Sequence, residues 1–242
     1  MKHASSQDPR RKPAHPFPAR MVVQFVVVIV FLPGVIFLAA WTLRWWNAWA
    51  YYATVLVGAL SSRLAIALRH PDLLAERGRS MESDDAKPGD RLIVLLAALL
   101  LPTIGLVVAG LDHRFGWTTV LPTGVHVTGL VMLAAGYALG AWAMAVNRFF
   151  SAVVRIQKER GHSVVTGGPY RVVRHPSYAG GLLATLGIPL LLNSWWAFLP
   201  ALGVVALTIV RTRLEDRTLQ KELPGYAAYA RRTRFRLMPG VW

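Results

Sequence analysis

Residues 161–181 read GHSVVTGGPYRVVRHPSYAGG, a polar and glycine-rich stretch with apolar segments on both sides. Polar backbone is tolerated at membrane depth only where it folds against protein or lines a cavity. Pro176 favours an extended conformation at His175 and a helix that starts at Ser177 or Tyr178. The free N–H groups of such a helix start attract an anionic group. We therefore interpret this stretch as one half of a ligand site.

The other half is expected about thirty-five residues later, at Arg211 and Glu215. These two residues are four apart on an expected helix, so they share one face. Taken alone, they are more typical of a surface ion pair worth at most about 0.5 kcal/mol. In the same way, His162 and His175 are typical of interfacial histidines with no ligand role.

The composition of the 242-residue chain is that of a membrane protein. Hydrophobic residues make up 54% of it, and the mean hydropathy is +0.40. Charged residues make up only 16%, whereas a soluble domain usually carries about 25%. The chain has no cysteine, which excludes disulfides, thiolate metal sites and cysteine nucleophiles. The length suits a single bundle.

The net charge of +15 has two interpretations, nucleic-acid binding or a membrane protein whose cytoplasmic loops collect Lys and Arg. The basic residues lie between the apolar runs, which favours the membrane interpretation and predicts no nucleic-acid partner. With both termini in the cytoplasm, 24 of the 27 basic residues lie in cytoplasmic segments. This orientation also puts the central loop, residues 147–178, and the C-terminal segment from Arg211 onward on the same side of the membrane.

The apolar runs predict an all-α, polytopic integral membrane helix bundle. Four long spans are expected at 21–43, 51–68, 92–111 and 124–146. The thirty-residue apolar run at 180–210 is too long for one span, so we predict a helical hairpin that turns at Asn193-Ser194. Pro33-Gly34 is expected to kink the first span, and Gly129, Gly136 and Gly140 are expected to allow close helix packing. An aromatic belt is expected at 44–52 and an outer loop at 112–123. A short interfacial helix is expected within 69–91.

Three regions follow from this pattern. Residues 1–20 form a disordered basic cytoplasmic tail, residues 21–146 hold the N-terminal transmembrane helices, and residues 147–242 hold the ligand region with the hairpin and a cytoplasmic cap. Two kinds of site find no support. His162 and His175 are thirteen apart and no HExxH pattern occurs, so no metal site is predicted. The chain also lacks the G-x-S-x-G elbow of a serine hydrolase.

From about residue 162 to 229 the chain resembles the isoprenylcysteine carboxyl methyltransferase family, which is related to the phospholipid N-methyltransferases; it is similar to bacterial members. The resemblance rests on Gly168-Pro169-Tyr170, Arg174-His175-Pro176-Ser177-Tyr178-Ala179-Gly180, Asn193, Arg211, Glu215-Asp216-Arg217-Thr218-Leu219 and Pro224-Gly225-Tyr226-Ala227-Ala228-Tyr229. One position departs from the family pattern, because Asp216 stands where the family has a second glutamate. We give Asp216 no role.

The resemblance implies an integral membrane enzyme that uses S-adenosyl-L-methionine, in the bacterial inner membrane. It implies catalytic roles for Arg211 and Glu215, with Arg211 facing the methyl acceptor. The residues that it implies for binding the cofactor are Gln157, His162, Ser163, Val164, Val165, Tyr170, His175, Pro176, Ser177, Tyr178 and Glu215.

The implied reaction is carboxyl O-methylation of an isoprenylcysteine-like or other small lipophilic acid that enters from the bilayer. Methylation of a phosphatidylethanolamine-type amine or of a thiol remains an alternative. Two interpretations outside the methyltransferases also remain open. One is a protein similar to the NADPH-dependent sterol reductases, and the other is an inactive membrane scaffold.

Overall fold

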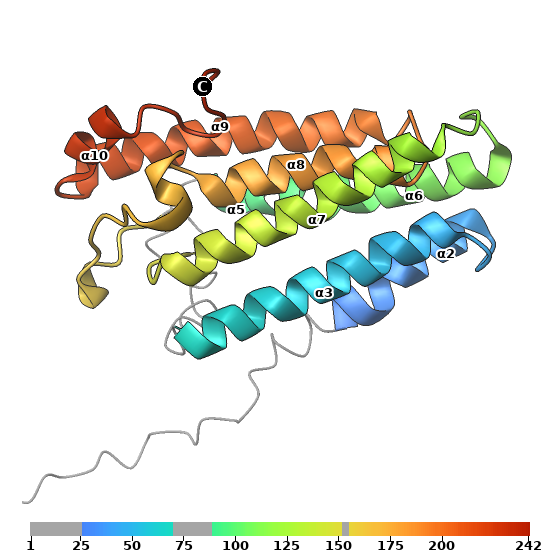
Figure 1. The fold of residues 1–242 in the computed structure, drawn as a ribbon, viewed down its shortest axis with the longest axis horizontal. Coiled ribbons are helices and arrows are strands. Elements are labelled where there is room, and N and C mark those ends of the chain that lie inside the picture. The colour runs from blue at the N-terminus through green and yellow to red at the C-terminus, as the bar shows by residue number, and fades with distance from the viewer. Residues whose placement is uncertain (1–25, 70–88, 152–154) are drawn as a thin grey trace, which may run out of the picture.

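The computed structural model describes residues 26–69, 89–151 and 155–242, and this part of the chain is helical with no strand. Most helices run along the long axis of one elongated bundle (Figure 1). The predicted all-α class is therefore confirmed. The N-terminal tail and residues 70–88 of the expected interfacial helix lie outside the described residues.

The first described segment starts as a π-helix, η1 (Val27–Phe31), and continues as α2 (Leu32–Ala40). Pro33 lies in the first turn of α2, a position that proline tolerates well. The predicted irregularity at Pro33-Gly34 thus appears as a change of helix type just upstream. α3 (Trp46–Arg69) starts five residues earlier than predicted, because part of the expected aromatic belt is itself helical.

The third helix is continuous from Asp90 to Phe115, through α5 (Asp90–Leu95), the π-helix η2 (Leu96–Leu100) and α6 (Leu101–Phe115). α7 (Thr123–Val146) follows after a loop that is shorter than predicted. The reason is Asp112, which stays in the helix and accepts hydrogen bonds from the Thr118 backbone N and Oγ1, both at 2.7 Å.

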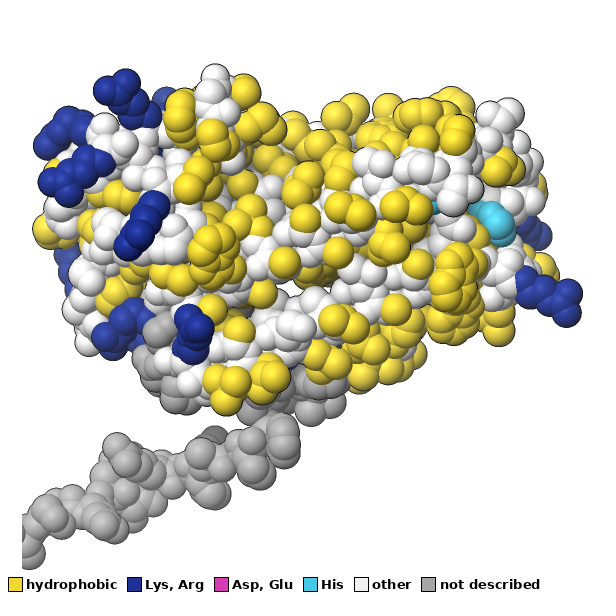
Figure 2. Space-filling model, in the orientation of Figure 1, with side chains coloured by type: hydrophobic (Ala, Val, Ile, Leu, Met, Phe, Trp, Pro, Cys, Tyr) yellow, Lys and Arg dark blue, Asp and Glu magenta, His cyan; other side chains and the backbone are white. Residues whose placement is uncertain are grey.

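Within the described residues, three helices are long and apolar enough to cross a membrane: α3, the continuous helix Asp90–Phe115, and α7. The first predicted span is only partly within the described residues, and α2 is short. Apolar side chains cover much of the outer surface along the helices (Figure 2), among them exposed Val57, Leu64 and Val131. This chain is an integral membrane protein.

Glycines bring α7 against α8 (Pro176–Leu191). A Cβ added to Gly136 would lie 2.4 Å from the carbonyl oxygen of Gly180, and one added to Gly187 would lie 2.6 Å from that of Gly129. The prediction of close packing is confirmed at Gly129 and Gly136. The backbone N of Gly140 also lies close to α8, 3.2 Å from a Cβ added at Gly180, but a Cβ added at Gly140 itself would meet no atom within 4 Å.

The predicted hairpin is confirmed, with α8 and α9 (Phe198–Glu222) as its arms. Asn193 turns the chain with a φ of 57°, and its Oδ1 accepts a hydrogen bond from the Leu121 backbone N at 2.7 Å. The second arm begins three residues later than predicted and runs past Val210 into the polar segment. The part of the chain that the structure describes also holds three short helices: η3 (Lys158–Arg160), η4 (Gly168–Arg171) and α10 (Tyr226–Arg232).

Lys and Arg side chains gather at the end of the bundle that carries α10 (Figure 2). The central loop between α7 and α8 lies at this same end (Figure 1). The exposed basic residues at this end include Arg213, Arg217, Lys221, Arg231, Arg232 and Arg234.

Candidate functional site

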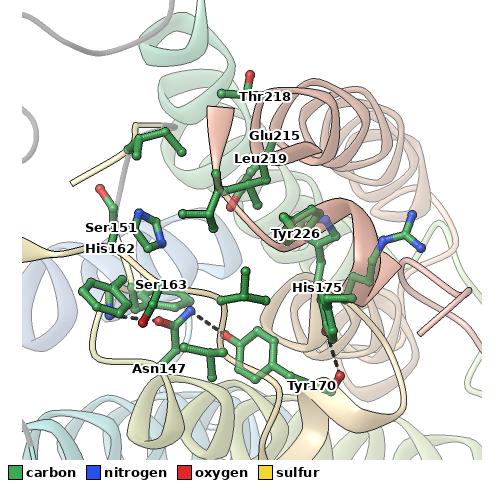
Figure 3. A pocket seen from close by; sticks show the side chains of 18 of the residues that line it. Asn147, Ser151, His162, Ser163, Tyr170, His175, Glu215, Thr218, Leu219 and Tyr226 are labelled. Atoms are coloured by element: carbon green, nitrogen blue, oxygen red, sulfur yellow. Dashed lines mark hydrogen bonds between the residues drawn. The ribbon is translucent and has the colours of Figure 1, made fainter. Parts of the chain in front are cut away.

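A pocket opens at the basic end of the bundle, between the central loop, the start of α8, the second half of α9 and α10 (Figure 3). Its cavity volume is about 80 Å³. Nine of the residues predicted to bind the cofactor line it: His162, Ser163, Val164, Val165, Tyr170, His175, Ser177, Tyr178 and Glu215. The structure therefore brings residues 162–165, the RHPSY segment and α9 to one place.

Asp216 is the centre of the polar network behind this pocket, and its side chain is fully buried. Arg174 holds both carboxylate oxygens, through Nε at 2.8 Å and Nη2 at 2.9 Å. Arg236 donates to Oδ2 at 2.9 Å, and the Tyr226 hydroxyl donates to Oδ1 at 3.1 Å. Burial raises the pKa of Asp216, but hydrogen bonds from His175, Arg174 and Arg236 outweigh that effect and hold it well below its usual value.

This network ties the start of α8 to the C-terminal segment. Nη1 of Arg174 donates to the carbonyl oxygens of Thr233 and Arg234, at 2.9 and 2.8 Å. The backbone N of His175 donates to the carbonyl oxygen of Arg236 at 2.9 Å. The His175 ring lies 3.4 Å from Asp216, so this histidine contacts the network as well as the pocket.

Glu215 and Tyr178 form the wall of the pocket nearest the membrane helices. The Tyr178 hydroxyl donates to Oε2 of Glu215 at 2.5 Å, which joins α8 to α9. The two rings of Tyr178 and His175 are stacked, with centroids 5.8 Å apart. Glu215 therefore faces the pocket as a carboxylate held in place by a phenol.

The central loop supplies an aromatic side of the pocket. The His162 ring stacks on Phe149, with centroids 4.6 Å apart. Burial, and then the charge of Arg160, lower the pKa of His162 below its usual 6.5, so the ring is neutral at pH 7. The Tyr170 hydroxyl accepts a hydrogen bond from Asn147, as the dashed line in Figure 3 shows.

Two residues predicted to bind the cofactor do not line the pocket. The Gln157 side chain is fully buried and donates to the carbonyl oxygen of Phe149 at 2.7 Å, while its Oε1 accepts from Arg160 at 2.6 Å. Pro176 is buried in the first turn of α8. Both shape the pocket through the backbone of neighbouring residues.

Arg211 does not line this pocket. Its Nε donates to Oδ1 of Asp90 at 2.9 Å, so the residue pairs with the start of α5. Its guanidinium also lies over the Tyr178 ring, 5.5 Å from the centroid. Arg211 thus joins α9 to α5. Burial lowers the pKa of Arg211, but nearby charges, including that of Glu215 on the same helix face, raise it above its usual value.

A second cavity, of about 610 Å³ and largely apolar, lies inside the bundle next to this pocket. Its walls come from α3, α6, α7, α8 and α9. Phe150, Ser177 and Tyr178 line both spaces. A polar pocket at the membrane edge and an apolar cavity at membrane depth therefore meet at the start of α8.

Sequence reasoning missed Asp216 and Asp90. The charge of Asp216 was visible, but its role depends on Arg236, which returns from the C-terminal segment. Asp90 is the acidic residue nearest the apolar run that follows it, and that position was a detectable signal for a partner. Asn147 and Phe149 also line the pocket without having been singled out.

Comparison with known protein families gives a match in the second half of the chain. Residues 125–224 match the family model described as phospholipid methyltransferase. This segment is therefore similar to the phospholipid methyltransferase family. It contains α8, α9, all but the first two residues of α7, and most of the pocket lining.

Relatives with similar sequences include plant, animal and bacterial proteins. A probable protein-S-isoprenylcysteine O-methyltransferase of Oryza sativa subsp. indica is 33% identical over 99 residues, 40% of this chain and 49% of that protein. The human protein-S-isoprenylcysteine O-methyltransferase is 37% identical over 103 residues, 42% and 34% of the two chains. The cobalt-zinc-cadmium resistance protein CzcN of Cupriavidus metallidurans is 36% identical over 102 residues, 39% and 44%. The chain thus spans about half, or less, of each relative.

Proposed function

We propose that this protein is an S-adenosyl-L-methionine-dependent membrane methyltransferase that acts on a lipophilic acceptor. One observation carries the proposal: the polar pocket and the apolar cavity share a wall formed by Phe150, Ser177 and Tyr178. A water-soluble methyl donor and a membrane-soluble acceptor need such a junction. The family of the segment 125–224 and the names of its relatives support the same reaction class.

The chemistry of the pocket fits this cofactor. Glu215 offers a carboxylate to a cationic group, and the pocket also contains aromatic rings that can contact an adenine. The pocket as it stands, at about 80 Å³, is smaller than the roughly 300–1,000 Å³ of most ligand pockets. Binding therefore requires the pocket to widen.

When bound, S-adenosyl-L-methionine supplies an electrophilic methyl group. The residues of this chain bind the methyl donor and the acceptor and orient them toward each other. Tyr178 fixes Glu215 on the pocket wall. The apolar cavity keeps water away from the acceptor, which favours a reaction in which an anion meets a sulfonium. Catalysis by positioning and electrostatics needs no covalent intermediate with the protein.

A lipophilic acid is the first candidate acceptor, as the names of the isoprenylcysteine O-methyltransferase relatives suggest. Arg211 would orient its carboxylate. One observation favours a second candidate, an amine or a thiol. Asp90 already offsets the charge of Arg211, at 2.9 Å, and would compete with an anionic acceptor.

The orientation in the membrane is also part of the proposal. The pocket and the exposed basic residues lie at the same end of the bundle, which we place in the cytoplasm with both chain termini. The resemblance to a Cupriavidus metallidurans protein supports a bacterial inner membrane. The cofactor then enters from the cytoplasm and the acceptor from the bilayer.

The direct test is a titration of the detergent-purified protein with S-adenosyl-L-methionine and, separately, with NADPH. We expect saturable binding of S-adenosyl-L-methionine that Glu215→Gln weakens about tenfold or more, because a charged hydrogen bond is lost. Glu222→Gln, an exposed change on the same helix, should leave the affinity unchanged. Binding of NADPH instead would indicate a reductase, and binding of neither by a folded sample would indicate a scaffold.

A further inference from the structure

The apolar cavity is long and uncharged. Along α8 its lining runs from Tyr178 to Pro189, which corresponds to about 16 Å at the helical rise per residue. Of the described residues that line it, none is charged. A ligand of this cavity therefore has an extended apolar body, and any polar group within it is neutral, because a buried charge would have no counter-ion.

Tyr51 lies at the deep end of this cavity, away from Tyr178. Tyr51 is only 6% exposed, and it packs in the same apolar cluster as Leu133 and Leu191. Tyr137 also lines the cavity. Within the described ranges, neither hydroxyl has a hydrogen-bond partner.

The other hydroxyls on α3 behave differently. The Tyr52 hydroxyl donates to the carbonyl oxygen of Ile29 at 3.4 Å, and Ser62 Oγ donates to that of Gly58 at 2.7 Å. The Tyr137 ring is also fixed, because it packs on Gly58, where an added Cβ would lie 2.6 Å from Tyr137 Cδ1. The two phenols are thus held in place while their hydrogen-bonding capacity is unused.

Both tyrosines line the cavity, and a tyrosine hydroxyl enclosed in a protein usually finds a hydrogen-bond partner. We infer that Tyr51, assisted by Tyr137, is a binding site for a neutral hydrogen-bonding group at the far end of the acceptor. The acceptor is then an elongated lipophilic molecule with two polar ends. One end is methylated beside Tyr178, and the other carries a hydroxyl or carbonyl group that bonds to Tyr51. The identity of this ligand as the acceptor rests on the proposed function.

The test uses two probes of equal length, dodecanoic acid and ω-hydroxydodecanoic acid, titrated against the full chain in detergent without any cofactor. We expect Tyr51→Phe to weaken binding of the hydroxy acid about tenfold and to change that of dodecanoic acid less than about twofold, because only the former loses a hydrogen bond. Tyr137→Phe should show the same selectivity with a smaller effect. Thermal unfolding of each variant verifies the fold.

A second variant shows whether the probes occupy the cavity. Gly181 lines it, and an added Cβ there would meet no atom within 4 Å, so we expect Gly181→Leu to extend a side chain into the cavity. It should weaken both probes by a similar factor. Equal effects of Tyr51→Phe on the two probes, or no effect of Gly181→Leu, would overturn the inference. Since no methyl transfer is measured, this result is separate from success or failure of the proposed reaction.

Discussion

At the scale of single residues, Asp216 is the side chain on which the site depends most. We expect Asp216→Asn to destabilise the protein by about 3–5 kcal/mol, because it leaves Arg174 buried without its counter-ion and Arg236 without its own. Thermal unfolding in detergent measures this loss. Asp216→Glu keeps the charge and should lose less. A change of less than about 0.5 kcal/mol in the asparagine variant, the size of an ordinary surface substitution, would refute the network.

The same residue sets a pH dependence. Since hydrogen bonds from His175, Arg174 and Arg236 outweigh burial and keep the pKa of Asp216 below 3.8, its ordinary value, the folded state resists a proton that the unfolded chain takes up. Its contribution to stability is therefore fully present above about pH 4 and is lost as the pH falls further. The asparagine variant should lack this part of the acid dependence.

Asp90 is the residue that separates the two candidate acceptors. We expect Asp90→Asn to strengthen binding of dodecanoic acid by about three- to tenfold, because Arg211 then loses a competing carboxylate. The affinity for dodecylamine should not increase in this variant. Glu222→Gln, which also removes one negative charge, is the matched control. Weaker binding of the acid in this variant would mean instead that Asp90 orients Arg211 for the acceptor.

At the scale of the helices, the contact between α7 and α8 places the pocket wall. Gly136→Ala would put a Cβ 2.4 Å from the Gly180 carbonyl oxygen, so we expect a loss of about 1–3 kcal/mol in unfolding free energy. Gly140→Ala on the same helix meets nothing within 4 Å and should be neutral or slightly stabilising. Equal stability of both variants would show that the helices are not in this close contact.

Element positions could be predicted well from the sequence, and contacts between them poorly. Apolar length and Pro176 gave α7 and α8 within a few residues, since both signals are local. The pairing of Asp90 with Arg211 joins residues 121 apart in the chain, and no local pattern reports it. The role of Asp216 likewise depends on a C-terminal segment that folds back onto α8. Residues 162–165, in contrast, lie in the pocket as the resemblance implied.

At the scale of the whole molecule, the bundle keeps its polar and apolar ligand spaces apart. The pocket lies at the basic end, and the apolar cavity extends from it into the helices that are long enough to cross a membrane. Tyr178 contributes to both spaces and bonds Glu215. The central claim is that the methyl donor and the acceptor bind in these two spaces and meet at Tyr178.

The measurement that tests this claim most directly is a labelled methyl-transfer assay with dodecanoic acid, in which KM is determined for each substrate. We expect Glu215→Gln to raise KM for S-adenosyl-L-methionine about tenfold and to leave KM for the acid nearly unchanged. Gly181→Leu should do the opposite, because it fills only the apolar cavity. If both variants raised the same KM, or if each raised both equally, the two spaces would not hold the two substrates separately.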